Sequence, residues 1–178
     1  MNSLVKKLQK SNKTKCKKIK IILTDVDGVL TDGGRYYSKN EEIFKKFHVR
    51  DGMGINILLR NGIKTAIVTK ENSKIVKNWA KEMNVSRVYS GIRNKEEELE
   101  KICKYYKVTP LEVAYIGDDV NDLELMKKVG FSATPFDGIL EAKKIANYVC
   151  KTSAGNGALR EIIDLILKEK FPKKTKWY

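Results

Sequence analysis

Two aspartates, Asp25 and Asp27, stand one residue apart at the end of the short apolar run "KIILT" and are followed by Gly28. In extended backbone, residues i and i+2 point to the same side, so both carboxylates can address one small volume. Three more aspartates follow in "GDDVND", at positions 118, 119 and 122. Carboxylates gathered at one place raise one another's pKa and destabilise a fold without a cation. The two motifs therefore predict a hard divalent ion with oxygen ligands, most simply Mg²⁺.

The first motif also limits which chemistry is expected. A calcium-binding loop requires an acid or amide at the position that Val29 occupies, so this loop is excluded. A metal beside a carboxylate suits phosphoryl transfer, because the ion neutralises phosphate oxygens while one aspartate attacks in line.

Short apolar runs alternate with amphipathic stretches along the chain. Four runs rich in β-branched or aromatic residues predict strands: 19–24, 63–69, 85–90 and 112–118. Six stretches predict helices: 51–61, 72–83, 94–106, 119–129, 138–146 and 157–170. This alternation is typical of an α/β, Rossmann-like parallel sheet with helices on both faces. Ligands bind beyond the carboxyl ends of such strands, where Asp25, Thr69 and Asp118 fall.

One segment interrupts the alternation between the first strand and the first helix. Residues 33–49, "GGRYYSKNEEIFKKFHV", have aromatic residues on both sides of a polar turn and predict an inserted β-hairpin. A two-stranded hairpin is marginally stable alone, so we expect it to pack on something, such as another subunit. The single histidine, His48, falls in this hairpin, so a histidine-based triad is not expected.

Length and composition favour one domain over residues 19–170, with basic tails at 1–18 and 171–178. The start of the chain has no signal-peptide core and no apolar run is long enough to span a membrane, so we expect a cytoplasmic protein. Three widely spaced cysteines without a CxxC pair predict free thiols. They are Cys16, Cys103 and Cys150.

Most of the formal net charge of +14 lies in the two ends of the chain. Residues 1–20 contain eight lysines and no acid, and residues 168–178 contain five lysines and one glutamate. The body between them is nearly balanced, which argues against nucleic acid as a partner. The basic ends are interpreted as solvated tails, with an anchor for anionic ligands as the alternative.

The chain resembles the haloacid dehalogenase-like phosphatases over about residues 20–167. The resemblance rests on "DVDGVLTDG", Thr69 at a strand end, Lys95 in "GIRNK", and "GDDVND", in that order. It implies Asp25 as the nucleophile that forms an aspartyl-phosphate, and Asp27 as acid to the leaving alkoxide and then base to water. Thr69 and Lys95 would bind the phosphoryl group. Mg²⁺ would be held by Asp25, Asp118 and the carbonyl of Asp27, with Asp119 and Asp122 in support.

Two further stretches, "FHVRDGMGINILLRNGI" and "YVCKTSAGNGALREI", are similar to a subgroup of that family without a large cap domain. This subgroup acts on 3-deoxy-D-manno-octulosonate 8-phosphate, and its relatives act on nine-carbon ulosonate 9-phosphates. The similarity implies a homotetramer joined by hairpins and a sugar-phosphate substrate. The residues it implies for substrate binding are Arg50, Asp51, Gly52, Thr69 and Lys95.

The chain departs from the subgroup pattern at two places, which leaves the sugar open. Lys70 and Glu71 follow Thr69 where Gly-Arg is usual, and Asn156 stands where Gly-Arg-Gly is usual. Two other functions are weighed against a phosphatase: a receiver module, whose phosphoacceptor would follow the third strand, and a non-catalytic oligomerisation domain. For the tail 171–178 we expect a lid over a neighbouring active site, with a solvated end as the alternative.

Overall fold

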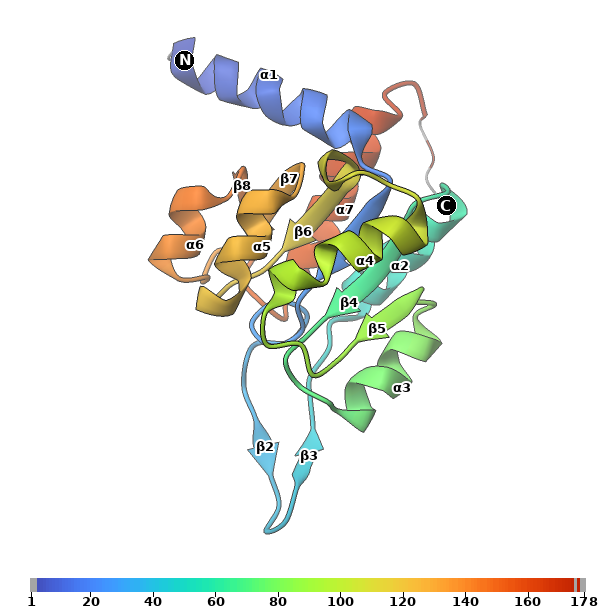
Figure 1. The fold of residues 1–178 in the computed structure, drawn as a ribbon, viewed down its shortest axis with the longest axis vertical. Helices are drawn as coiled ribbons and strands as arrows, with labels where there is room; N and C mark the ends of the chain where they lie inside the picture. The colour runs from blue at the N-terminus through green and yellow to red at the C-terminus, as the bar shows by residue number, and fades with distance from the viewer. Residues whose placement is uncertain (1–2, 175, 177–178) are drawn as a thin grey trace.

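The computed structural model describes residues 3–174 and 176, and within them six parallel strands form one sheet (Figure 1). The strand order is β5-β4-β1-β6-β7-β8. The strands are β1 (Ile21–Thr24), β4 (Lys64–Val68), β5 (Arg87–Tyr89), β6 (Val113–Ile116), β7 (Phe131–Thr134) and β8 (Tyr148–Val149). β1 pairs in register with β4 on one side and β6 on the other, so their carboxyl ends lie together.

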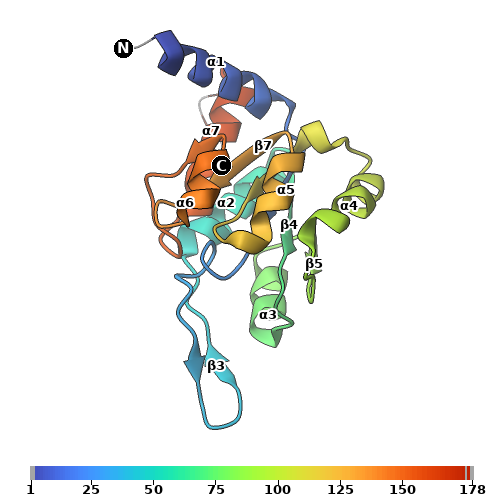
Figure 2. The ribbon, with the colours of Figure 1, turned by 60° about the vertical axis from the view of Figure 1, so that its left-hand side comes forward.

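Helices cover both faces of the sheet, as Figures 1 and 2 show. Successive strand residues point to opposite faces, so Ile22 packs in one apolar cluster and Leu23 in the other. The first face is covered by α2 (Val49–Arg60), α3 (Lys74–Glu82) and α7 (Ala158–Lys170). The second is covered by α4 (Leu99–Tyr106), α5 (Leu123–Lys128) and α6 (Leu140–Ile145). The predicted α/β class is confirmed.

The four predicted strands and six predicted helices are present, but two helical stretches are divided. The stretch 94–106 begins with the 3-10 helix η1 (Lys95–Glu97), and 119–129 begins with η3 (Val120–Asp122). A third 3-10 helix, η2 (Pro110–Glu112), precedes β6. Each divided stretch carries a charged residue, Lys95 or Asp122, that is fully buried near the carboxyl ends of the strands. Strands β7 and β8 were not predicted.

The inserted hairpin is confirmed and forms its own two-stranded antiparallel sheet. Its strands are β2 (Tyr36–Tyr37) and β3 (Glu42–Phe44), and it projects from the carboxyl end of the main sheet (Figure 1). The rings of Tyr36 and Phe44 stack with centroids 4.2 Å apart, although both side chains are exposed. His48, predicted as a hairpin residue, is instead the N-cap of α2, and its Nδ1 accepts a hydrogen bond from the backbone NH of Arg50.

The basic start of the chain is helical as α1 (Ser3–Lys18) and lies at the opposite end from the hairpin (Figure 1). Its last turn joins the fold, because Cys16 is fully buried in the core. Lys170 of α7 donates hydrogen bonds from Nζ to the carbonyl oxygens of Lys17 and Ile19, which caps the end of α1. Whether residues 1–18 lie outside the phosphatase domain stays a prediction.

Two smaller predictions are also answered by the described residues. All three cysteines are free and buried. No helix among residues 3–174 combines the length and the apolar character needed to cross a membrane.

Candidate active site

The carboxyl ends of three adjacent strands bring the predicted residues together. Asp25 follows β1, Thr69 follows β4, and Asp118 comes two residues after β6. Above them is an open cleft of about 230 Å³. Its lining residues are Asp25, Asp27, Thr69, Lys70, Glu71, Asp119, Val120 and Asn121. The expectation that separate motifs converge at this end of the sheet is confirmed.

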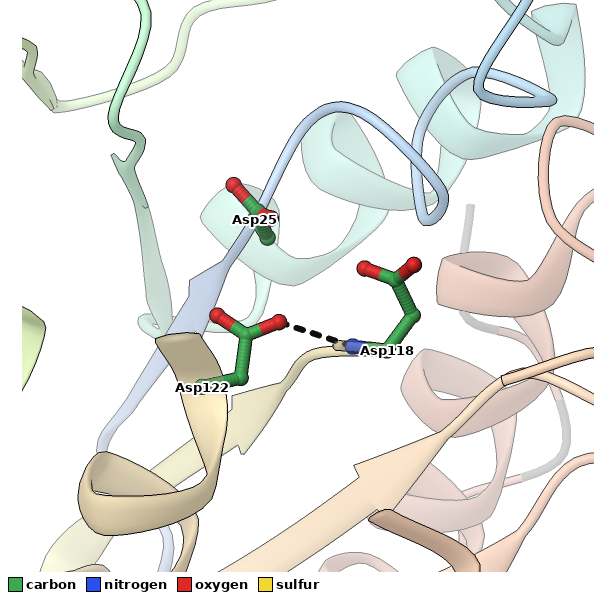
Figure 3. A group of neighbouring side chains, drawn as sticks. All are labelled: Asp25, Asp118 and Asp122. Atoms are coloured by element: carbon green, nitrogen blue, oxygen red, sulfur yellow. Dashed lines mark hydrogen bonds between the residues drawn. The ribbon is translucent and has the colours of Figure 1, made fainter. Parts of the chain in front are cut away.

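Three carboxylates form a cluster, as Figure 3 shows, and one of them, that of Asp25, lines the cleft. Oxygens of Asp25, Asp118 and Asp122 all lie within 4.8 Å of one another. Burial raises the pKa of Asp25 to about 7; Lys95 opposes this shift and Asp122 adds to it. Burial and the charges of Asp122 and Asp25 raise the pKa of Asp118 to about 8. So much buried negative charge fits a divalent cation with oxygen ligands.

The hydrogen bonds of the cluster separate ligands from supporting residues. Both oxygens of Asp122 are committed: Oδ1 accepts from Lys95 and Tyr115, and Oδ2 accepts from the backbone NH groups of Asp118 and Asp119. By contrast, the buried Oδ1 of Asp118 has no hydrogen-bond partner among the described residues. Asp25 and Asp118 are therefore the side chains that fit Mg²⁺, and Asp122 orients the loop. The carbonyl of Asp27 as a third ligand stays a prediction.

Gly28 allows the loop after β1 to approach Asp118. Its φ is +84°, and a Cβ atom at this position would lie 2.0 Å from Oδ2 of Asp118. Any side chain here would push the loop away from the carboxylate that it must meet. The glycine directly behind the aspartate pair is thus required by both backbone conformation and space.

Lys95 lies beneath the nucleophile position, with no exposed surface. Its Nζ is 2.9 Å from Oδ1 of Asp25, 2.6 Å from Oδ1 of Asp122 and 3.2 Å from the hydroxyl of Tyr115. Burial alone would lower the pKa of Lys95, but the charges of the two aspartates raise it overall, so the ammonium stays charged. Tyr115 was not predicted as part of this group.

Thr69 is buried and lines the cleft. The hydroxyl oxygen accepts a hydrogen bond from the backbone NH of Glu71 at 3.2 Å, which leaves the O–H proton available for a phosphoryl oxygen. The Thr69 backbone is itself held by Tyr89 and Ile92. Asp119 also lines the cleft, and its side chain caps η3 by accepting from the NH of Val120.

Asp27 is held by a residue that sequence reasoning missed. Oδ1 of Asp27 accepts from Nζ of Lys45 at 2.6 Å and from the hydroxyl of Thr31 at 3.3 Å. The Lys45 side chain is fully buried and also pairs with Glu42 at 2.9 Å. A lysine in a polar hairpin is ordinarily interpreted as solvated, so no sequence signal marked it.

Arg50, Asp51 and Gly52 do not line the cleft in this chain. Arg50 lies in a separate hollow of about 520 Å³ with Arg160 and Asn156. Asp51 is buried, and its Oδ1 accepts from the backbone NH of Arg160 at 2.7 Å; Gly52 is buried close to Met83. The structure thus places Arg50 and Asp51 beside Arg160 of α7, and Gly52 against the end of α3. The substrate-binding role of these three residues stays a prediction.

Comparison with known proteins identifies relatives of this chain. Residues 57–162 match the family model of haloacid dehalogenase-like hydrolases. The chain is 37% identical over 153 residues to 3-deoxy-D-manno-octulosonate 8-phosphate phosphatase KdsC of Escherichia coli K12, an alignment that covers 86% of this chain and 81% of that protein.

Solved structures agree with the sequence match. The crystal structure of 3-deoxy-D-manno-octulosonate 8-phosphate phosphatase from Yersinia pestis superposes with a TM-score of 0.87 at 34% identity, covering 90% of this chain and 86% of that chain. The enzyme of that name from Moraxella catarrhalis, in complex with magnesium, phosphate and KDO, gives a TM-score of 0.86 at 36% identity, covering 89% and 91%. The fold, the carboxylate cluster and these matches agree, and the chain belongs to the haloacid dehalogenase-like hydrolase family.

Proposed function

We propose that this chain is a Mg²⁺-dependent phosphatase that hydrolyses 3-deoxy-D-manno-octulosonate 8-phosphate through an aspartyl-phosphate. The observation that carries the proposal is the pairing of Asp25 with Lys95 beneath an open cleft, beside the unpartnered oxygen of Asp118. The substrate comes from the relatives, which carry this activity in their names and are 34–37% identical.

In the first half of the reaction, a carboxylate oxygen of Asp25 attacks phosphorus. The bond from phosphorus to Asp25 forms as the bond to the sugar oxygen breaks, and Asp27 gives its proton to that leaving oxygen. In the second half, Asp27 takes a proton from the water that attacks the aspartyl-phosphate, which releases phosphate and restores Asp25. Mg²⁺ held by Asp25 and Asp118 would supply positive charge to the phosphoryl oxygens.

Two further residues bind the phosphoryl group in this scheme. The Thr69 hydroxyl donates its free proton to a phosphoryl oxygen, because its oxygen already accepts from Glu71. The Lys95 ammonium opposes the rise in the pKa of Asp25 that burial causes, and it offsets the charge that develops in the transition state. Its burial makes this offset stronger than a solvated lysine would give.

One observation favours a second substrate class, a nine-carbon ulosonate 9-phosphate of the neuraminate type. Lys70 and Glu71, where the chain departs from the octulosonate pattern, both line the cleft. Both follow Thr69, which binds the phosphoryl group in this scheme, so we expect them to contact the part of the substrate beyond the phosphate. The change from Gly-Arg to Lys-Glu therefore affects sugar selection and leaves the phosphoryl chemistry unaltered.

The proposal includes a homotetramer joined through the hairpin, in the cytoplasm, without nucleic acid as a partner. Support for assembly comes from the exposed apolar residues at the hairpin: Tyr36, Tyr37, Ile43 and Phe44. Apolar side chains gathered on a projecting element are typical of a protein interface. A non-catalytic oligomerisation domain would use the same surface but would not need the Asp25, Lys95 and Asp118 arrangement.

The proposal is tested by phosphate release from a panel of eight- and nine-carbon ulosonate phosphates, with Mg²⁺ and with excess chelator. We expect release from at least one of these esters that stops with chelator and returns with Mg²⁺. A protein that accumulates stable phosphate without turnover would instead favour the receiver module. A protein inactive on every ester of the panel would contradict the proposal.

A further inference from the structure

Lys45 lies at the base of the hairpin, directly after β3, and its whole side chain is buried. Its ammonium bridges two carboxylates: Oδ1 of Asp27 at 2.6 Å and Oε1 of Glu42 at 2.9 Å. A buried ammonium is costly unless it is paired, and here both partners are within hydrogen-bond distance. The pairing therefore fixes three side chains relative to one another.

The ion pairs continue beyond Lys45 across the hairpin. Nε of Arg35 lies 3.3 Å from the same oxygen of Glu42, and Nη2 of Arg35 lies 3.5 Å from Glu71. Glu71 lines the cleft next to Thr69. The base of the hairpin thus connects the loop after β1 to the loop after β4, on two sides of the same cleft.

The two oxygens of the Asp27 carboxyl group differ in their contacts. Both of its side-chain hydrogen bonds, from Lys45 and from Thr31, go to Oδ1. Among the residues that the structure describes, no protein donor reaches Oδ2. The side chain is 26% exposed and lines the cleft, so Oδ2 is the oxygen that can exchange a proton with substrate or water.

We propose that Lys45 is a positioning residue for the acid-base step: it anchors Oδ1 of Asp27 so that Oδ2 faces the leaving oxygen of the substrate. This inference rests on the proposed function and assigns the hairpin a role in the active site of its own subunit. As the bond from phosphorus to the sugar oxygen breaks, the proton of Asp27 moves to that oxygen, and the Lys45 ammonium neutralises the carboxylate that remains. Anchoring by a buried cation keeps the carboxyl from rotating away from the leaving oxygen.

The test uses two esters that differ in their need for an acid. The alkoxide released from 3-deoxy-D-manno-octulosonate 8-phosphate must be protonated, whereas 4-nitrophenolate is stable enough to leave without a proton. For Lys45→Met we expect kcat/KM, which reports the half-reaction that releases the alcohol, to fall about 100-fold on the sugar-acid ester and less than about 5-fold on 4-nitrophenyl phosphate, since only the alkoxide needs a proton from Asp27. Hydrolysis of the aspartyl-phosphate is common to both esters, so a loss in that step lowers kcat on both. A distorted fold or a damaged metal site would lower both values of kcat/KM alike.

Lys46→Met is the matched control. Lys46 is the next residue in the chain, is 53% exposed, and pairs with Asp32 at 3.0 Å outside the cleft. Removing it deletes the same charge from the same hairpin, so we expect both esters to be hydrolysed at rates close to those of the unaltered protein.

Glu42→Gln provides a second variant of nearly unchanged volume, should Lys45→Met fold poorly. It weakens the anchor of Lys45 without removing the lysine, so we expect the same selective loss at about a tenth of the size. Equal losses of kcat/KM on both esters, or no loss of kcat/KM on the sugar-acid ester, would overturn the inference alone. An unaltered protein that releases phosphate from neither ester would overturn the proposed function and this inference with it.

Discussion

Two buried lysines hold the two aspartates of the first motif, and they differ in where they come from. Lys95 joins Asp25 to Asp122, and Lys45 joins Asp27 to Glu42. Lys95 belongs to η1, packed against the sheet, whereas Lys45 belongs to the inserted hairpin. The sheet thus supports the nucleophile, which every phosphate ester needs, and the hairpin supports the acid, whose importance depends on the leaving group.

The two lysines also differ in the balance of charge around them. Lys95 faces three clustered carboxylates, on Asp25, Asp118 and Asp122. Lys45 faces Asp27 and Glu42, and Arg35 adds a second cation to that group. The first cluster has surplus negative charge and fits a metal ion, while the second is close to neutral. Metal removal should therefore affect the Lys95 cluster and leave the Lys45 cluster intact.

The largest effect should follow from Asp25→Asn, because an amide of nearly the same volume is no nucleophile. We expect kcat to fall by about 10⁴-fold or more on both the sugar-acid ester and 4-nitrophenyl phosphate. Phosphate release measures the loss, and an unchanged circular dichroism spectrum serves as the control for folding. Substantial turnover on either ester would rule out the covalent role of Asp25.

Lys95→Met should separate the two lysines most clearly. The ammonium acts on charge at the phosphoryl group, so we expect kcat/KM to fall about 10²- to 10³-fold on both esters alike. The measurement is the ratio of the two losses, compared with the unequal losses expected for Lys45→Met. A loss confined to the sugar-acid ester would show that Lys95, like Lys45, acts on the leaving group. The proposed difference in function between the two lysines would then be wrong.

Sequence reasoning could predict the Lys95 cluster because its members follow a general rule. Asp25, Thr69 and Asp118 each stand at or just beyond the end of a predicted strand, and parallel strands bring such positions together. Lys95 was placed by its resemblance to a known motif. The clustering of these residues required no detailed knowledge of the packing.

The Lys45 cluster could not be predicted because it depends on how the hairpin folds back. Lys45 and Asp27 are 18 residues apart, and their contact requires the hairpin to bury a lysine that its sequence presents as solvated. Asp51 was expected to bind substrate, but its partner is the backbone NH of Arg160, which is 109 residues away on α7. No local sequence pattern marks a contact between residues so far apart. Strand β7 was missed because "FSAT" is short and half polar, although the sheet buries all four residues.

The surplus charge of the Lys95 cluster predicts how pH affects the metal-free protein. Burial, together with neighbouring carboxylates, raises the pKa of Asp25 to about 7 and that of Asp118 to about 8. In the unfolded chain both groups titrate near about 4. The folded state therefore holds these protons more tightly, so the free energy of unfolding should decrease as the pH rises from about 4 to about 8.

We expect the melting temperature in excess chelator to fall by several degrees between pH 5 and pH 8, since about 1 kcal/mol corresponds to about 2–4 °C for a domain of this size. Mg²⁺ should restore most of this loss at pH 8 and change little at pH 5, where the carboxyls are protonated. Asp118→Asn is the control and should flatten the dependence. Equal stabilisation by Mg²⁺ at both pH values would contradict the surplus of charge at this cluster.

The smallest effect concerns the tail 171–178. Phe171 packs against the core, and Nζ of Lys174 donates to the side chain of Asn61, just beyond the end of α2. Positions 175, 177 and 178, including the predicted lid residue Trp177, lie outside the described residues. The described part of the tail thus starts at the end of the molecule opposite the hairpin (Figure 1). If the tail acts as a lid, we therefore expect it to cover the cleft of a neighbouring subunit.

Deleting residues 172–178, which retains the packed Phe171, should raise KM for the sugar-acid ester about 5-fold, as expected from losing about 1 kcal/mol of binding. It should change KM for 4-nitrophenyl phosphate much less, because that ester has no sugar carboxylate for the lysines to meet. Mixing the truncated protein with Asp25→Asn protomers should recover part of the affinity if the tail acts across subunits, because the inactive protomers still carry tails. Lys174→Ala removes only the contact with Asn61 and separates tail placement from tail loss. Unchanged kinetics after truncation would leave the tail as a solvated end and confine leaving-group selection to the cleft and the hairpin.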